Sequence, residues 1–209
     1  MKFTLVIVCT LLAISQTTQL YSQKKDKKNI KQTRDTIAVS DIGALFRAAL
    51  PPGFNKPKAD STLFATEYGN VMMRAAIAEN QKSAYMIGFY DFFPDYFVGK
   101  TTAQALDSLQ SQVLGNMQGK LSRQYKLMLA GKKLRRAENA ERPVPDVLLE
   151  SRTTYFTTVT DKKKAYWRFA LILDSPRIYQ IAVTSSNKSY LDSPTVNKFF
   201  DSAQIVIAE

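Results

Sequence analysis

The feature that most restricts the fold of this chain is a series of short segments rich in β-forming residues, each ended by a turn signal. Phe46, Ala48 and Leu50 alternate along the first such segment, which stops at Pro-Pro-Gly. Comparable segments follow at residues 62–68, 71–79, 83–93, 125–134, 147–159, 165–173, 178–185 and 204–208. Short strands joined by tight turns pair with their neighbours, so the series predicts a mainly antiparallel sheet.

Turn residues predict which of these strands are neighbours. Gly69-Asn70 separates residues 62–68 from residues 71–79 and predicts a hairpin. A second turn follows, and it makes residues 83–93 the third strand of a meander.

Two segments show the helical period instead. A helix is predicted from Thr101 or Thr102, and its apolar stripe consists of Ala105, Leu106, Leu109, Val113 and Leu114. A second helix is predicted over residues 192–202, with Ser193 as its cap and Pro194 at its first position. Strands and helices in this order predict an α+β fold, in which helices pack on the antiparallel sheet.

The N-terminus has the three-part pattern of a cleaved signal peptide. Lys2 is followed by an apolar run over residues 3–14, then by polar residues and the small Ser22. The apolar run is shorter than the roughly 20 residues that span a bilayer, which disfavours an uncleaved anchor. We therefore predict a signal peptide over residues 1–22, cleaved after Ser22, with Ser15 as the alternative site. The mature chain is then periplasmic or secreted.

Cys9 raises the alternative of a lipoprotein. A lipidated cysteine follows a small residue and closes the apolar run, whereas Cys9 follows Val8 and the run continues beyond it. A soluble mature chain is therefore favoured. Residues 23–42 are polar and lysine-rich, and they predict a disordered spacer, with a basic arm for an anionic surface as the alternative. Residues 43–209 then form a single domain.

Composition excludes several classes of chemistry. The chain has no histidine and one cysteine, Cys9, within the predicted leader. Serine–histidine and cysteine–histidine catalysis, imidazole metal sites and disulfides therefore have no residues to use. Glycine-rich phosphate loops and metalloprotease motifs are also missing from the sequence. We expect a protein that is not an enzyme and that needs no cofactor or metal.

One aromatic segment, residues 88–99, is the densest candidate for a binding surface. Strand alternation buries only about half of such a run. Tyr90, Phe92, Phe93 and Tyr96, with Asp95 among them, would then form an exposed edge for another protein. The alternative is that the following helix or the spacer covers them.

A pair of acidic residues in the same segment offers a second hypothesis. Asp91 and Asp95 could act as the two carboxylates of a hydrolase. They supply too few oxygen ligands for a hard cation, so no metal site is predicted.

The chain is strongly basic, with a formal net charge of +11. Three clusters carry much of that charge: Lys24, Lys25, Lys27 and Lys28; Lys132, Lys133, Arg135 and Arg136; and Lys162, Lys163 and Lys164. Such clusters are usually solvated. If the last two converge in space, they would contact acidic partners or lipid headgroups. No nucleic-acid-binding motif accompanies the charge, so nucleic acid is not expected as a partner.

Several segments together resemble one family. They are FRAALPPGF, AYMIGFYDFFPD, the late hairpin WRFALILDSPRIYQIAV, and NKFFDSAQIV near the C-terminus. From about Gly43 to Glu209 this order is similar to bacterial members of the PsbP-like superfamily, whose fold is shared with a Ran-binding nuclear import factor. The resemblance implies an α/β/α sandwich with a central antiparallel sheet, and a protein that binds other proteins. It carries over no site residue.

The sequence therefore predicts an exported, non-catalytic binding or scaffolding domain that engages another protein of the cell envelope. A salt-sensitive binder of anionic lipid or polymer is one alternative, and contact with a membrane surface belongs to it. A hydrolase that uses only carboxylates is the other. The sequence leaves the oligomeric state open.

Overall fold

The computed structural model describes residues 35–41, 44–66, 69–117, 119–126, 134–136, 149–160 and 163–207. The predicted signal peptide and most of the predicted spacer lie outside these residues.

Most strands belong to one seven-stranded sheet in which every neighbouring pair is antiparallel. In spatial order its strands are β3 (Lys58–Thr66), β4 (Gly69–Glu79), β5 (Ser83–Asp91), β10 (Arg177–Ser185), β9 (Lys163–Asp174), β8 (Ser151–Thr160) and β6 (Lys120–Lys126). The predicted meander is confirmed as β3–β4–β5, and the late hairpin is confirmed as β9–β10.

A second sheet of four strands lies beside the first. Its order is β1 (Thr36–Asp41), β2 (Ala44–Ala49), β11 (Gln204–Ile207) and β7 (Leu134–Arg136), and only β11 and β7 run parallel. The prediction that the spacer extends to residue 42 is therefore wrong. Residues 36–41 form a strand because Ile37 and Val39 alternate with more exposed neighbours and are buried against the core.

Both predicted helices are present. Helix α2 spans Thr102–Asn116, and Thr101 caps it: its hydroxyl accepts from the Gln104 amide while the Gln104 side chain accepts from the Thr101 amide. Helix α3 spans Pro194–Ser202, capped by Ser193. Two short 3₁₀ helices, η2 (Pro94–Phe97) and η3 (Lys188–Asp192), precede them.

No helix in the described part of the chain combines the length and the apolar character needed to cross a membrane.

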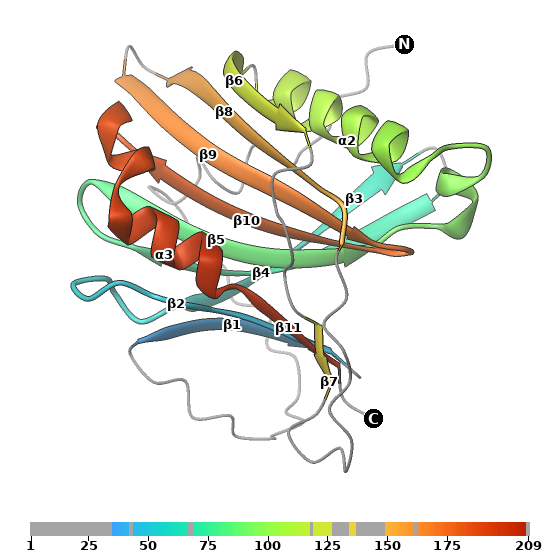
Figure 1. Ribbon diagram of the computed structural model, residues 1–209, viewed down its shortest axis with the longest axis horizontal. Coiled ribbons are helices and arrows are strands. Elements are labelled where there is room, and N and C mark those ends of the chain that lie inside the picture. The colour runs from blue at the N-terminus through green and yellow to red at the C-terminus, as the bar shows by residue number, and fades with distance from the viewer. Residues whose placement is uncertain are drawn as a thin grey trace.

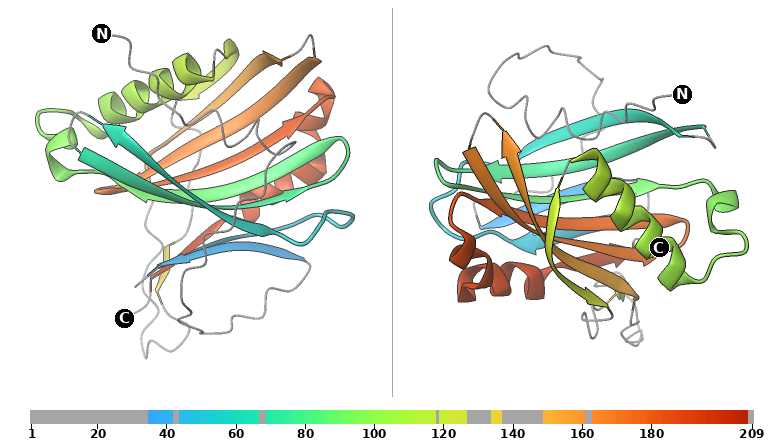
Figure 2. Two further views of the ribbon diagram at one scale, coloured as in Figure 1. Left: turned by 180° about the vertical axis from the view of Figure 1, so that it is seen from behind. Right: turned by 90° about the horizontal axis from the view of Figure 1, so that it is seen from above.

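The seven-stranded sheet is covered on both faces. Helix α2 packs on one face through Leu106, Leu109 and Val113. The other face packs against α3 and the second sheet through residues such as Phe46 and Phe199. Figures 1 and 2 show this arrangement, with α2 above the large sheet and the small sheet below it in Figure 1. The prediction of an α+β fold with a mainly antiparallel sheet is confirmed, and the second sheet is an addition to it.

Two details of the sequence prediction differ from the structure. Gly69 and Asn70 pair with Thr66 and Ala65 inside the β3–β4 ladder, so they extend β4 and do not form the turn. The strand predicted over residues 125–134 falls largely outside the described residues, and β6 begins earlier, at Lys120.

Candidate functional site

The aromatic segment predicted as a binding surface is mostly buried. Tyr90, Phe92 and Tyr96 are 6%, 7% and 3% exposed and belong to the core beneath α2. The Tyr96 hydroxyl donates to Ser108 Oγ of that helix at 3.2 Å. Phe93 is partly buried against the same cluster, and Asp95 is exposed on η2. The prediction of an exposed aromatic patch is therefore wrong, because α2 covers the face to which these rings point.

The two carboxylates of the hydrolase hypothesis are not paired with each other. Arg177 holds Asp91 in a bidentate ion pair, with its Nε and a terminal nitrogen 2.6 and 2.7 Å from the two carboxylate oxygens. Among the described residues, no group of three or more histidine, cysteine, aspartate or glutamate side chains is placed to hold a metal ion.

Burial and charge around this ion pair shift several pKa values. The hydrogen bonds to Asp91 raise the pKa of Arg177, whose guanidinium also lies 4.4 Å from the centre of the Phe89 ring. Burial raises the pKa of Tyr179, and burial likewise raises that of Asp174 against the opposing pull of Arg177. The guanidinium thus stays charged, and the pair acts as a cross-strand tie between β5 and β10.

The basic clusters predicted from the sequence do not converge. Lys132 and Lys133 lie outside the described residues, as does Lys162. Arg135 and Arg136 belong to β7 at the bottom of Figure 1, whereas Lys163 and Lys164 begin β9 at the top left. These two clusters occupy opposite parts of the molecule.

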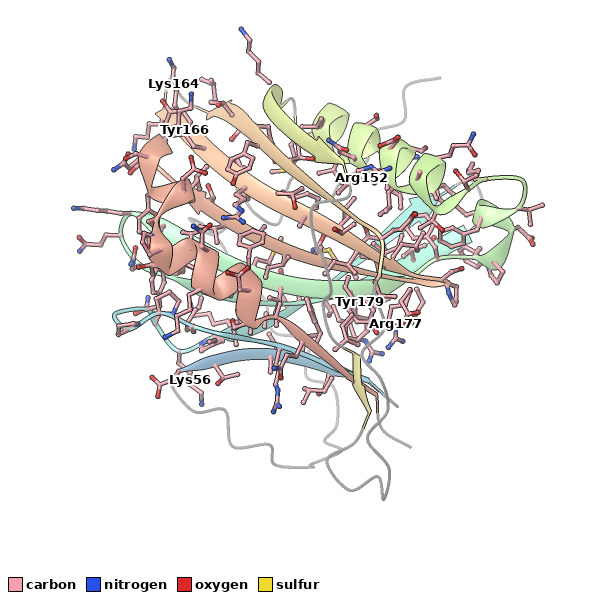
Figure 3. The ribbon with its side chains drawn as sticks, viewed as in Figure 1. Lys56, Arg152, Lys164, Tyr166, Arg177 and Tyr179 are labelled. Atoms are coloured by element: carbon pink, nitrogen blue, oxygen red, sulfur yellow. The ribbon has the colours of Figure 1, made fainter. Side chains whose placement is uncertain are left out.

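A different set of lysines gathers at one end of the seven-stranded sheet. We call it the lysine-rich end, and its members are Lys56, Lys58, Lys82, Lys120, Lys163, Lys164 and Lys188, all exposed. Figure 3 shows Lys56 and Lys164 on the left side of the molecule, away from Arg177 and Tyr179.

The strand register explains why these lysines share an end. Ser83 at the start of β5 pairs with Ser185 at the end of β10, and Ser185 pairs with Tyr166 near the start of β9. Tyr166 pairs with Thr157, which pairs with Lys120 of β6. The turns and strand starts along this row therefore lie at the same end of the sheet.

Hydrogen bonds tie the loops of this end to each other. The Lys82 carbonyl accepts from the Ser186 amide at 3.2 Å and from Ser185 Oγ at 3.3 Å. Asn80 Oδ1 accepts from the amides of Lys82 and Ser83, both at 2.9 Å. The turns that carry Lys82 and Lys188 are consequently fixed relative to one another before any ligand binds.

Aromatic packing supports the same loops from below. The hydroxyls of Tyr85 and Tyr190 are 2.9 Å apart, and the Tyr85 ring makes edge contacts with Phe54 and Phe199. Burial, with the hydrogen bond to Tyr190 as a second cause, raises the pKa of Tyr85. Phe54 lies two residues before Lys56, so this cluster holds the 51–57 connection against the sheet.

The lysine-rich end has an excess of positive charge. Against the seven lysines, the described carboxylates at this end are those of Asp35, Glu79 and Asp192, and Asp60 follows Lys58 two residues farther along β3. Among the described residues, salt bridges join Arg152 to Asp107 and Arg177 to Asp91, and none of the seven lysines belongs to either. The opposite end is closer to balance, because its described carboxylates include Asp91, Asp95, Asp174 and Glu150 beside Arg74, Lys100 and Arg177.

One exposed apolar side chain belongs to the same end. Val159 is 61% exposed near the tip of the β8–β9 hairpin and pairs across the ladder with Lys164. An apolar side chain thus stands beside exposed ammonium groups.

Sequence reasoning missed this site because its members are scattered along the chain between residues 56 and 188. Only Lys163 and Lys164 belonged to a recognised cluster. The available signal was positional, since each of the seven lies in a turn or at a strand or helix start.

Comparisons with known proteins give no family. No protein-family model matches the chain, and no curated protein matches it. Among solved structures, the chain is similar to PA94, a protein of unknown function from Pseudomonas aeruginosa. The TM-score is 0.39 and the sequence identity 10%, over 68% of this chain and 94% of that one. A likeness this distant says nothing about function, so the candidate site rests on its own geometry.

Proposed function

We propose that this chain is an exported, non-catalytic binding domain that engages an anionic partner of the cell envelope through its lysine-rich end. The observation that carries the proposal is that the seven lysines of the lysine-rich end lie at one end of the sheet. They are Lys56, Lys58, Lys82, Lys120, Lys163, Lys164 and Lys188. Several exposed cations at one end of the sheet create a positive potential there, and that potential attracts anionic ligands.

The fixed geometry of the loops supports the same proposal. Side chains on turns that are already ordered lose less backbone entropy on binding than side chains on a flexible segment. Lys82 and Lys188 come from turns joined by the hydrogen bonds of the Lys82 carbonyl. A partner would therefore meet a charge pattern that is set in advance.

The resemblance to the PsbP-like superfamily supports a binding role as well, and it adds two finer proposals. One is that the layer of α2, the seven-stranded sheet and the layer of α3 correspond to the three layers of the α/β/α sandwich of that family. The other is that the protein shares the family's character as a binder of other proteins.

The test measures association of the exported chain with isolated cell envelopes, after expression of the full sequence. We expect binding that weakens as salt is raised, because ions screen exposed charges. The variant Lys82→Gln with Lys163→Gln, Lys164→Gln and Lys188→Gln should lose most of this binding. The control Lys100→Gln removes a lysine at the opposite end and should bind like the unmodified chain. Equal binding by the fourfold variant would overturn the proposal.

A further inference from the structure

We infer that the partner of the lysine-rich end is a membrane surface with anionic phospholipid headgroups, and that Val159 enters the interface between headgroups and acyl chains. This inference rests on the proposed function and names the ligand of the same site.

The spread of the charges argues for a surface. The lysines lie along the whole width of the sheet, from Lys56, just before β3, to Lys120 at the start of β6, with Lys58 farther in along β3, opposite Ile77. Each comes from a separate turn or strand start, apart from Lys56 and Lys58 at the start of β3 and the neighbours Lys163 and Lys164. Such an array matches many phosphates arranged in a plane better than a single phosphate held by convergent donors.

The type of cation argues in the same direction. Every member of the lysine-rich end carries an ammonium group, which acts as a compact point charge and attracts headgroups without fixed geometry. Protein–protein interfaces favour arginine and aromatic residues at their centre and are depleted in lysine. A lysine array without an exposed aromatic anchor among its described members therefore favours lipid over an acidic protein.

Val159 supplies the apolar component that a membrane surface accepts. It is 61% exposed, and its ladder partner Lys164 lies directly beside it. Interfacial binding combines burial of apolar side chains with attraction between lysines and anionic lipid. The long stem of Lys164 can lie along the apolar boundary while its ammonium group stays at the headgroups.

The experiment uses flotation of the exported chain with two kinds of vesicle. One kind contains only phosphatidylcholine, and the other contains phosphatidylglycerol as well. We expect binding to the anionic vesicles only, with loss of binding at high salt, where the Debye length falls from about 10 Å at 0.1 M to about 3 Å at 1 M.

Variants connect that binding to the named residues. Each lysine near the surface contributes roughly fivefold in affinity, so Lys163→Gln with Lys164→Gln should weaken binding about 25-fold. Val159→Ser should weaken binding severalfold while leaving its salt dependence unchanged, since no charge is removed. Lys100→Gln, which removes one lysine at the opposite end, is the control and should bind normally.

The outcomes separate this inference from the proposed function. Absence of flotation with anionic vesicles overturns the lipid assignment, as does a Lys163→Gln, Lys164→Gln variant that floats like the unmodified chain. If lysine-dependent binding to envelopes persists without vesicle binding and is abolished by protease treatment of the envelopes, the partner is a protein. The proposed function then stands and the lipid inference falls.

Discussion

At one end of β5 and β10 the charged side chains of neighbouring strands neutralise each other, whereas at the other end of the same two strands the charges remain apart. Asp91 and Arg177 face each other in the ladder and form a bidentate ion pair. At the far end the facing residues are Ser83 and Ser185, whose hydroxyls are 3.0 Å apart, and the charges sit in the turns beyond them.

The difference separates two uses of charge. A cation whose cross-strand neighbour is a carboxylate is committed to holding the sheet together. Cations carried by turns, with hydroxyl pairs beneath them, contribute little to the fold and stay accessible to a ligand. Stability and binding should therefore respond to different ends of the molecule.

The largest effect should come from reversing charge at the lysine-rich end. Lys82→Glu with Lys188→Glu changes the charge by four units, and affinity for anionic vesicles or envelopes should fall by about two to three orders of magnitude. Vesicle flotation over a range of lipid concentrations measures the change. The matched reversal at the other end, Arg74→Glu with Lys100→Glu, should have a far smaller effect. Equal losses in the two variants would break the comparison between the ends.

A second prediction concerns the ion pair. Arg177→Ala removes both hydrogen bonds to Asp91 and the contact with the Phe89 ring. We expect the free energy of unfolding to fall by about 1–3 kcal/mol, less than for a fully buried pair because the Asp91 side chain is 52% exposed. Denaturant unfolding measures it, with Asp91→Ala and the double variant completing a mutant cycle. Vesicle affinity should be unchanged, and a parallel loss of affinity would contradict the division of roles.

The support beneath the lysine-rich end gives a third, smaller effect. Tyr190→Phe removes the hydroxyl that lies 2.9 Å from that of Tyr85. The free energy of unfolding should fall by about 1 kcal/mol, the typical contribution of one hydrogen bond. Affinity should fall less than in any variant that removes a lysine of the lysine-rich end. If affinity fell as steeply as with Lys163→Gln and Lys164→Gln, the tyrosine pair itself would belong to the binding surface.

The smallest effect concerns the pH dependence at the opposite end. Burial raises the pKa of Asp174 above its ordinary 3.8 in the folded state. Below pH 3.8 the carboxyl is protonated in the folded and the unfolded state and does not change the free energy of unfolding. As the pH rises through the folded-state pKa, the buried carboxyl ionises and the free energy of unfolding falls. Asp174→Asn should therefore stabilise the protein near neutral pH and have no effect in acid. Because the group is partly solvated, the gain should stay below about 1 kcal/mol. Thermal unfolding at two pH values checks the sign.

Much of the fold was predictable from local patterns. Ser193 caps the second helix as predicted, Thr101 is one of the two caps predicted for the first helix, and the late hairpin follows from its turn residues. The strand at residues 36–41 was missed because its short apolar alternation follows a lysine-rich stretch that is typical of disorder. Its stability comes from pairing with β2 and from burial of Ile37, which are properties of the folded chain.

The candidate site was less predictable for a physical reason. Whether Tyr90 and Phe92 are exposed depends on where α2 packs, and their own alternation does not contain that information. The lysine-rich end depends on the register of six strand pairs, and this register brings Lys56 and Lys188 to one end of the sheet although 132 residue positions separate them. Sequence patterns identify residues that are neighbours along the chain, whereas strand pairing brings the residues of this site together in the folded protein.

The second sheet has a consequence for the order of events when the protein is made. Strand β2 lies between β1, at the start of the described domain, and β11, near its end. The β2 edge thus stays open until Gln204–Ile207 has been synthesised, and long-range pairing of this kind delays completion of a fold. The proposed export requires the chain to cross a membrane through a narrow channel, and such a delay keeps the polypeptide unfolded while it crosses. The same four residues then complete the sheet once they emerge.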